Sequence, residues 1–154
     1  MEDASIGLRE GFEFLEHMSD IYVRARGRSL LELLENAGLA LFEAMTDTSK
    51  LLERVDRAVL AEGFDLENLL YKWLENLLIL YYSERLMCRK VRIEEFRIEK
   101  ENGDERYFVK GVCRGDFFDP SIHEARVEIK SPTYSLMRIE KTADHWTAYF
   151  VLDI

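Results

Sequence analysis

Two segments of the chain carry apolar residues every three or four positions, the spacing that gathers them on one face of a helix. The first begins after Ser29, which stands three residues before Glu32 as in a helix capping box, and ends near the turn-forming residues 46–49. The second spans 66–86 after Asp65, which can cap it. The pattern therefore predicts two helices.

The second predicted helix is apolar over more than one stripe. One side carries Leu66, Leu70, Trp73, Leu77 and Tyr81. Additional apolar positions widen that surface, namely Leu69, Leu74, Leu78 and Ile79. A helix that is apolar over most of its circumference is either deeply covered by other elements or part of a subunit contact. Both interpretations remain open from the sequence.

Most of the remaining chain alternates or clusters apolar residues as strands do. Strands are expected at 21–26, 51–61, 91–98, 107–109, 126–130, 134–140 and 145–154. The apolar parity changes between Ile93 and Phe96, which predicts a β-bulge at Glu94-Glu95. Asn102-Gly103 is a strong signal for a two-residue hairpin turn.

Helices set among these strands predict an α+β domain. We expect one mostly antiparallel or mixed sheet with two helices packed on one face. Residues 1–11 are expected to be a loose N-terminal segment, and residues 12–154 a single domain, because no repeat, linker or low-complexity stretch divides them.

Charge narrows the classes of partner. The formal net charge is −9, whereas a protein that binds nucleic acid directly is expected to carry a basic surface. Tight nucleic-acid binding is therefore not expected, and proteins or cations are the better candidates. The longest apolar run, 77–82, is too short to span a bilayer, and no signal peptide is apparent, so we expect a cytoplasmic protein.

The two cysteines do not form a recognisable motif. Cys88 and Cys113 lack the spacing of a redox or zinc site, and both lie in strand-like segments. The sequence predicts that they are two buried free thiols in a reducing cytosol.

Two aspartates stand at the ends of predicted strands. In the last strand Asp153 lies opposite in parity to the apolar positions, and Ile154, expected to anchor the core, adds the terminal carboxylate. Asp20 stands at the start of the first strand. Such oxygen donors suit calcium or magnesium, but spacing alone does not distinguish them from solvated strand-end acids.

Histidines and nucleophiles give no clear catalytic signal. His17, three residues before Asp20, can be a ligand, an acid–base group, a partner that orients the aspartate, or a structural residue. A structural role is expected for His123 and His145. The chain has no recognisable nucleophile elbow or glycine-rich phosphate loop, so no catalytic or cofactor-binding residues are predicted.

Six segments in a characteristic order carry a family resemblance. They are Phe14-Leu15-Glu16-His17 leading to Asp20, Met45-Thr46-Asp47-Thr48, Leu69-Leu70-Tyr71-Lys72-Trp73-Leu74, Phe118-Asp119-Pro120 with His123, Glu128-Ile129-Lys130 with Thr133-Tyr134, and Asp153-Ile154. On these segments the chain resembles the archease family from residue 12 to residue 154. Met18-Ser19 and Ser131-Pro132 depart from the family's usual residues without removing an acid.

The resemblance implies an accessory protein, not an enzyme. Archeases activate the GTP-dependent RNA ligase that joins tRNA halves, by promoting guanylylation of the ligase and so its multiple turnover. The resemblance also implies a divalent cation, calcium first and magnesium or manganese as alternatives. Its implied ligands are Asp20, Asp153 and Ile154, with Asp47 as a fourth candidate. His17 and Lys130 are candidates for a supporting or partner-contacting role.

Two other functions remain open. One is a small metal-dependent phosphoesterase, in which the acids would hold magnesium and His17 would act as acid or base. The other, also associated with the family, is a chaperone-like modulator of a tRNA-modifying enzyme. The sequence does not determine the oligomeric state.

Overall fold

The computed structural model describes the backbone of residues 5–9, 11–15 and 19–154, and the side chains of 11–15 and 19–154. Its elements are β1 (Ser5–Arg9), β2 (Phe12–Leu15), β3 (Ile21–Gly27), α1 (Leu30–Met45), the 3-10 helix η1 (Thr48–Lys50), β4 (Val55–Gly63), α2 (Leu66–Glu84), β5 (Leu86–Glu101), β6 (Asp104–Phe117), β7 (Ser131–Lys141) and β8 (Trp146–Asp153). No helix in this described part is long and apolar enough to cross a membrane.

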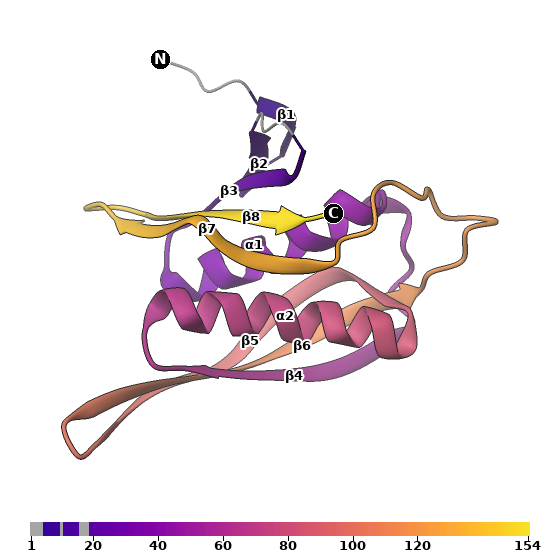
Figure 1. Ribbon diagram of the computed structural model, residues 1–154. Helices are drawn as coiled ribbons and strands as arrows, with labels where there is room; N and C mark the ends of the chain where they lie inside the picture. Colours follow the sequence, from indigo (N-terminus) through magenta and orange to yellow (C-terminus); the bar gives the residue numbers. More distant parts are fainter. Residues whose placement is uncertain (1–4, 10, 16–18) are drawn as a thin grey trace.

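The strands form two sheets with the helices between them (Figure 1). Sheet A has the order β1-β2-β3-β8-β7 and sheet B the order β4-β6-β5, and every pairing is antiparallel. Helix α1 contacts β3 and β5, and α2 contacts β7 and β4, so each helix touches both sheets. The α+β class is confirmed. The expected single sheet is wrong, because the helices are apolar enough to be covered on two sides.

Both helices begin at their predicted caps. The Ser29 hydroxyl accepts a hydrogen bond from the Glu32 N–H, and the Asp65 carboxylate accepts one from the Asn68 N–H. Helix α2 ends two residues earlier than predicted, because Arg85 adopts a left-handed backbone conformation (φ 61°) and β5 follows at once. The chain therefore passes from α2 into sheet B without a loop.

The broad apolar surface of α2 reflects deep coverage. Leu69, Leu74 and the indole-bearing Trp73 are fully buried, and the Trp73 Nε1–H donates to the Leu34 carbonyl of α1 at 2.9 Å. Ile79 differs, since 54% of it is exposed. The coverage interpretation is confirmed for the first three positions, whereas Ile79 faces solvent.

The hairpin between β5 and β6 forms as predicted. Asn102 and Gly103 have φ values of 52° and 85°, the positive values that a type I′ turn requires, and Glu101 pairs with Asp104. The register of β5 shifts between Ile93 and Glu95, at the predicted bulge. The hairpin's outer strand, β5, is one edge of sheet B.

Three predicted boundaries are wrong. Residues 51–54 precede β4 as an irregular segment after η1, and β1 occupies part of the segment expected to be loose. Residues 126–130 form no strand, because their backbone donors go to different elements: the Arg126 N–H to the Met45 carbonyl and the Lys130 N–H to the Asp153 carbonyl. The segment 118–130 thus runs as a connection from sheet B to sheet A.

The cysteines are joined, not free. Cys88 of β5 and Cys113 of β6 form a disulfide, and both residues are fully buried. The register places Cys88 opposite Gly115 and Cys113 opposite Val91, so the two cysteines lie diagonally across the β5–β6 pair with Cα atoms 5.3 Å apart. The prediction of two free thiols is wrong, because their spacing of 25 residues carries no information about strand register.

Arg126 fastens segment 118–130 to the end of α1. Its guanidinium donates to the Glu43 carbonyl at 2.8 Å and to the Glu43 carboxylate at 2.9 Å. Thr48 donates to the same carboxylate through its N–H and its hydroxyl. Burial opposes ionisation of Glu43, but the hydrogen bonds from Thr48 and Arg126 outweigh it and hold the pKa of this carboxyl below its ordinary value.

The disulfide should leave no reactive thiol. Thiol titration of the protein in denaturant without reductant is expected to detect no free cysteine. Full reduction should destabilise the fold by about 3–4 kcal/mol for a loop of this length. That loss corresponds to a melting temperature lower by about 2–4 °C per kcal/mol. Detection of two thiols per chain in freshly purified, unreduced protein would contradict the pairing.

The Glu43–Arg126 contact should stabilise the protein in a pH-dependent way. Because the pKa of Glu43 is lowered on folding, its contribution is present above the unfolded-state pKa near 4.5 and is lost as pH falls through the folded-state pKa. We expect Glu43→Gln to cost about 1.5–3 kcal/mol at pH 7 and progressively less in acid. Urea unfolding between pH 7 and pH 3 measures this difference, and Asp104→Asn, at an exposed carboxylate of the β5–β6 turn, serves as the control. An equal cost at both ends of the range would refute the linkage.

Candidate functional site

The start of β3 and the end of β8 lie beside each other in sheet A. These strands pair antiparallel, with Ile21 opposite Leu152 and Tyr22 opposite Val151. Asp20 immediately precedes this register and Asp153 immediately follows it. Residues opposite each other in an antiparallel pair share one face, with Cβ atoms about 4.5–5.5 Å apart in regular pairs. Asp20 therefore lies just before β3 and Asp153 is the last residue of β8, at the same end of the sheet.

Asp153 also contacts the next strand. Strand β8 lies between β3 and β7, and Ser131 at the start of β7 is the register partner of Asp153. The Asp153 carbonyl accepts a hydrogen bond of 2.7 Å from the Lys130 N–H, and the Lys130 residue is exposed. The start of β3, the end of β8 and the start of β7 thus meet at one end of sheet A. We call this region, with Asp20 and Asp153, the acidic end.

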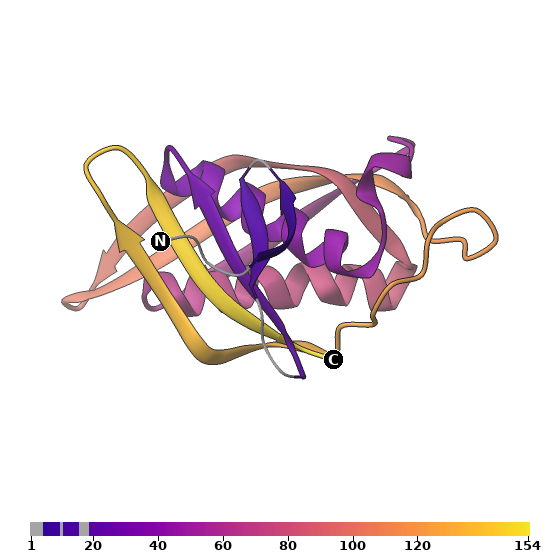
Figure 2. The ribbon, with the colours of Figure 1, turned by 90° about the horizontal axis from the view of Figure 1, so that it is seen from above.

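Ile154 lies at the acidic end, although not as predicted. Strand β8 ends at Asp153, and Ile154 is 37% exposed, so the expectation that it anchors the core is wrong. Leu152, fully buried, is the last core residue of the strand. Figure 2 shows the C-terminus beside the beginning of β7. Its carboxylate adds an oxygen donor close to Asp153 along the chain.

Asp47 stands between α1 and η1, where its carboxylate caps η1. Hydrogen bonds from Ser49 to its carboxylate lower the pKa of Asp47, and the charges of Arg126 and Lys50 act in the same direction. Among the described residues Asp47 forms no group of three possible metal ligands with Asp20 and Asp153, so its part in the site stays a prediction.

The histidines fall into three situations. His17 lies outside the described residues. His123 is buried and structural, as expected: its N–H donates to the Asp119 carbonyl, and its Nδ1 accepts from the Asp119 N–H at 2.9 Å. His145 stands next to Asp144 at the turn between β7 and β8, 2.8 Å from its carboxylate.

The donor chemistry at the acidic end suits a hard cation. Asp20, Asp153 and the terminal carboxylate of Ile154 offer only oxygen ligands, the type that calcium and magnesium prefer over zinc. Asp47 Oδ1 already accepts from the Ser49 N–H and hydroxyl. Over residues 11–15 and 19–154, no group of three or more Asp, Glu, His or Cys side chains stands ready to hold a metal. Metal ligation by the four residues stays a prediction.

The contact between Glu43 and Arg126, at the end of α1, was not predicted from the sequence. Glu43 and Arg126 are 83 residues apart, and neither belongs to a recognisable motif. The one available signal is that α1 lacks a basic residue in its last turn. Helix C-termini favour a nearby cation, and here Arg126 supplies it from elsewhere in the chain.

Comparison with known sequences gives a consistent result. Residues 12–154 match the model of a family described as "Archease protein family (MTH1598/TM1083)". The chain is 44% identical to Protein archease of Sulfurisphaera tokodaii over 144 residues, covering 93% of this chain and 98% of the relative. It is 41% identical to Protein archease of Methanosarcina acetivorans over 143 residues, covering 93% and 95%.

Comparison with solved structures agrees with the fold. The solution structure of Methanobacterium thermoautotrophicum protein 1598 is similar with a TM-score of 0.73 at 30% identity, covering 95% of this chain and all of that one. A crystal structure from Thermotoga maritima, described as an archease and possible chaperone, gives 0.53 at 21% identity over 97% and 99%, which supports the fold alone. The family match across residues 12–154, together with relatives above 40% identity over almost their whole length, establishes that the chain belongs to the archease family.

Proposed function

We propose that this protein is an accessory factor, without catalysis of its own, that activates the GTP-dependent tRNA-splicing RNA ligase. It acts by promoting guanylylation of the ligase and thereby its multiple turnover. Family membership supports this role. The observation that supports it for this chain is the β3–β8 register, which brings together the strand ends next to Asp20 and Asp153.

The working part in this proposal is the acidic end. Asp20, Asp153 and an oxygen of Ile154 hold a divalent cation, calcium first and magnesium or manganese as alternatives, with Asp47 nearby. The cation supplies positive charge that offsets repulsion between the carboxylates. Because Lys130 is exposed beside Asp153, its ammonium group is available to contact the partner.

Electrostatics favours a partner with a basic pocket. A net charge of −9 opposes tight binding to tRNA, so the ligase and not its substrate is the proposed contact. Attraction between an acidic end and a basic nucleotide pocket accelerates association at low salt. We also propose a cytoplasmic location for this protein.

A chaperone-like role toward a tRNA-modifying enzyme is the second candidate. The Thermotoga maritima structure is described as a possible chaperone, and that description favours this alternative for the family. The two roles differ in what they require. Activation of the ligase depends on particular carboxylates, whereas a general chaperone contact tolerates their loss.

Replacing either central aspartate should abolish activation without unfolding the protein. Asp20→Ala and Asp153→Ala remove half-buried strand-end carboxylates and open no core cavity, so stability should change by no more than about 0.5 kcal/mol. Multiple-turnover ligation with limiting ligase should fall to the level seen without this protein. Asp104→Ala, which removes an exposed carboxylate from the β5–β6 turn, is the matched control. Full activation by both variants, with wild-type melting temperatures, would refute the mechanism.

Calcium should stabilise the wild-type protein through the same residues. A ligand at one hundred times its dissociation constant adds about 2.7 kcal/mol of stability. For a domain of this size that is a rise in melting temperature of about 5–10 °C, reversed by a chelator. Asp20→Ala and Asp153→Ala should show no rise, and zinc should act more weakly than calcium. An equal rise in wild type and both variants would place the cation elsewhere.

A further inference from the structure

Sheet B extends past its third strand as a two-stranded arm. Strand β4 ends at Gly63, opposite Tyr107 of β6, so beyond that position only β5 and β6 remain paired. We use "the arm" for residues 96–107. Figure 1 shows this hairpin projecting from the body of the protein. Its outer border is the free edge of β5.

The turn determines which backbone groups of β5 point outward. In a two-residue hairpin the residues that flank the turn, here Glu101 and Asp104, form a hydrogen-bonded pair, and bonded pairs alternate along the strands. Residues 97, 99 and 101 therefore bond to β6. Phe96, Ile98 and Lys100 direct their N–H and C=O groups away from β6, toward solvent.

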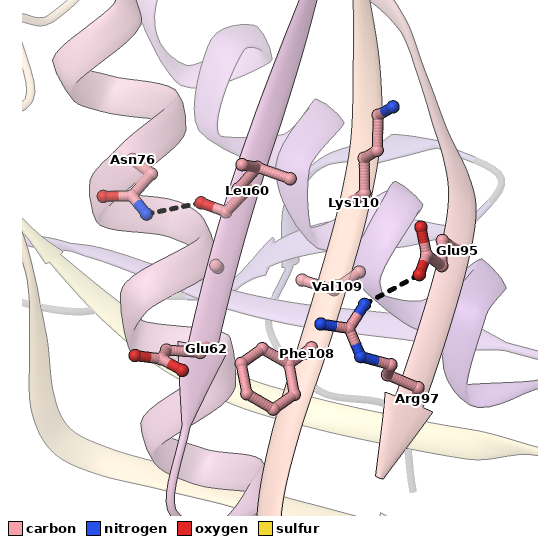
Figure 3. A pocket seen from close by; sticks show the side chains of 9 residues that line it. Leu60, Glu62, Asn76, Glu95, Arg97, Phe108, Val109 and Lys110 are labelled. Carbon is pink, nitrogen blue, oxygen red and sulfur yellow. Dashed lines mark hydrogen bonds and ion pairs between the residues drawn. The ribbon is translucent and has the colours of Figure 1, made fainter. Parts of the chain in front are cut away.

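In the body of sheet B, side chains occupy such outward groups. The Asn76 amide of α2 donates to the Leu60 carbonyl on the free edge of β4 at 2.7 Å (Figure 3). Arg57 donates to the Asp56 carbonyl at 2.9 Å on that strand. On the opposite edge, the Glu35 carboxylate of α1 accepts from the Ile93 N–H at 2.8 Å. Such contacts reduce the tendency of an edge strand to pair with another chain.

The outward-facing backbone groups of the arm differ from those in the body of sheet B. Within the described part of the chain, no side chain forms a hydrogen bond with the backbone of Phe96, Ile98 or Lys100. The Ile98 residue is 51% exposed, and Lys100 is exposed as well. An edge strand with free N–H and C=O groups and an accessible apolar side chain is a template for an added strand.

Charge indicates which strand would be added. Residues 94–106 include six carboxylates and only three basic side chains. All three bases are already paired. Arg97 pairs with Glu95 at 2.7 Å and with Glu99 at 2.8 Å (Figure 3 shows the Glu95 pair), Lys100 pairs with Glu105 at 3.8 Å, and Arg106 pairs with Glu62 at 3.4 Å. An approaching segment with lysine or arginine side chains is attracted, whereas a second copy of this arm would bring like charges together.

We propose that the edge of β5 from Phe96 to Lys100 is a docking site where an extended, basic segment of a protein partner pairs as an additional strand. Main-chain hydrogen bonds to the three outward-facing residues fix the segment, and its lysine or arginine side chains meet the arm's carboxylates. The site is separate from the acidic end and does not depend on ligase activation.

Hydrogen exchange with a defined peptide tests the geometry. The probe is an acetylated and amidated octapeptide of alternating lysine and valine, compared with its glutamate–valine counterpart. In the free protein the amides of Phe96, Ile98 and Lys100 should exchange rapidly, and those of 97, 99 and 101 slowly. The lysine peptide should slow exchange of the first set at least tenfold and leave the second unchanged. The glutamate peptide should have no effect.

A proline substitution supplies the matched variant. Because the Ile98 N–H points outward, Ile98→Pro removes a docking donor and no bond to β6, and proline is tolerated at such edge positions. Affinity for the fluorescent lysine peptide should fall at least tenfold, whereas Ile98→Val, which keeps the N–H, should stay within about threefold of wild type. Melting temperature verifies the fold of both variants.

Several outcomes would overturn the proposal. They are absence of binding of the lysine peptide to wild type, protection of amides at the acidic end instead of the arm, and self-association of the protein through this edge without peptide. Because the exchange pattern is measured in wild-type protein, the conclusion holds even if Ile98→Pro fails to fold.

Discussion

The fold depends on the need to cover two helices that are apolar on more than one side. Trp73 is fully buried where α1 and α2 meet, and its indole N–H is satisfied by the Leu34 carbonyl. A single sheet could cover only one side of this pair, so the strands divide into sheets A and B on opposite sides. Each sheet then keeps one outer face, and those faces are where polar and charged residues alternate. The positions of the acidic end and the arm both follow from this layering.

Segment 118–130 connects the layers at the end where the candidate site lies. It leaves sheet B after β6, bonds to the end of α1 through Arg126, and joins sheet A at Lys130. The tyrosine hydroxyl of Tyr82 on α2 also donates to the Ile129 carbonyl. One irregular stretch of chain therefore bonds to both helices and to sheet A, although most of its residues are exposed and only His123 and Ile129 are buried. The surroundings of Asp47 and Asp153 share this support.

The sequence predicted local structure well where local chemistry decides it. Ser29 and Asp65 capped the helices as expected, Asn102-Gly103 formed the turn, and the bulge lay beside Glu95. Predictions that depended on distant partners were less successful. The alternation in 126–130 resembles a strand, although its donors bond to two different elements, and the Cys88–Cys113 pair depends on a strand register that spacing does not encode. Parity indicates Asp153 as a strand-end acid that points away from the core, whereas the pairing of β3 with β8 depends on a register that parity does not encode. Arg126 carried no local signal.

The interior position of β8 in sheet A has a consequence for biosynthesis. This strand pairs with β3 on one side and β7 on the other, so contacts between residues about 130 positions apart must wait until β8 has been synthesised. Long-range antiparallel pairings of this kind form slowly, because a large loop must close first. Sheet B and the helices can be complete on the ribosome while β3 and β7 still lack the strand that joins them. The candidate site therefore forms only after β8 has been added, and chains truncated before β8 cannot present it to a partner.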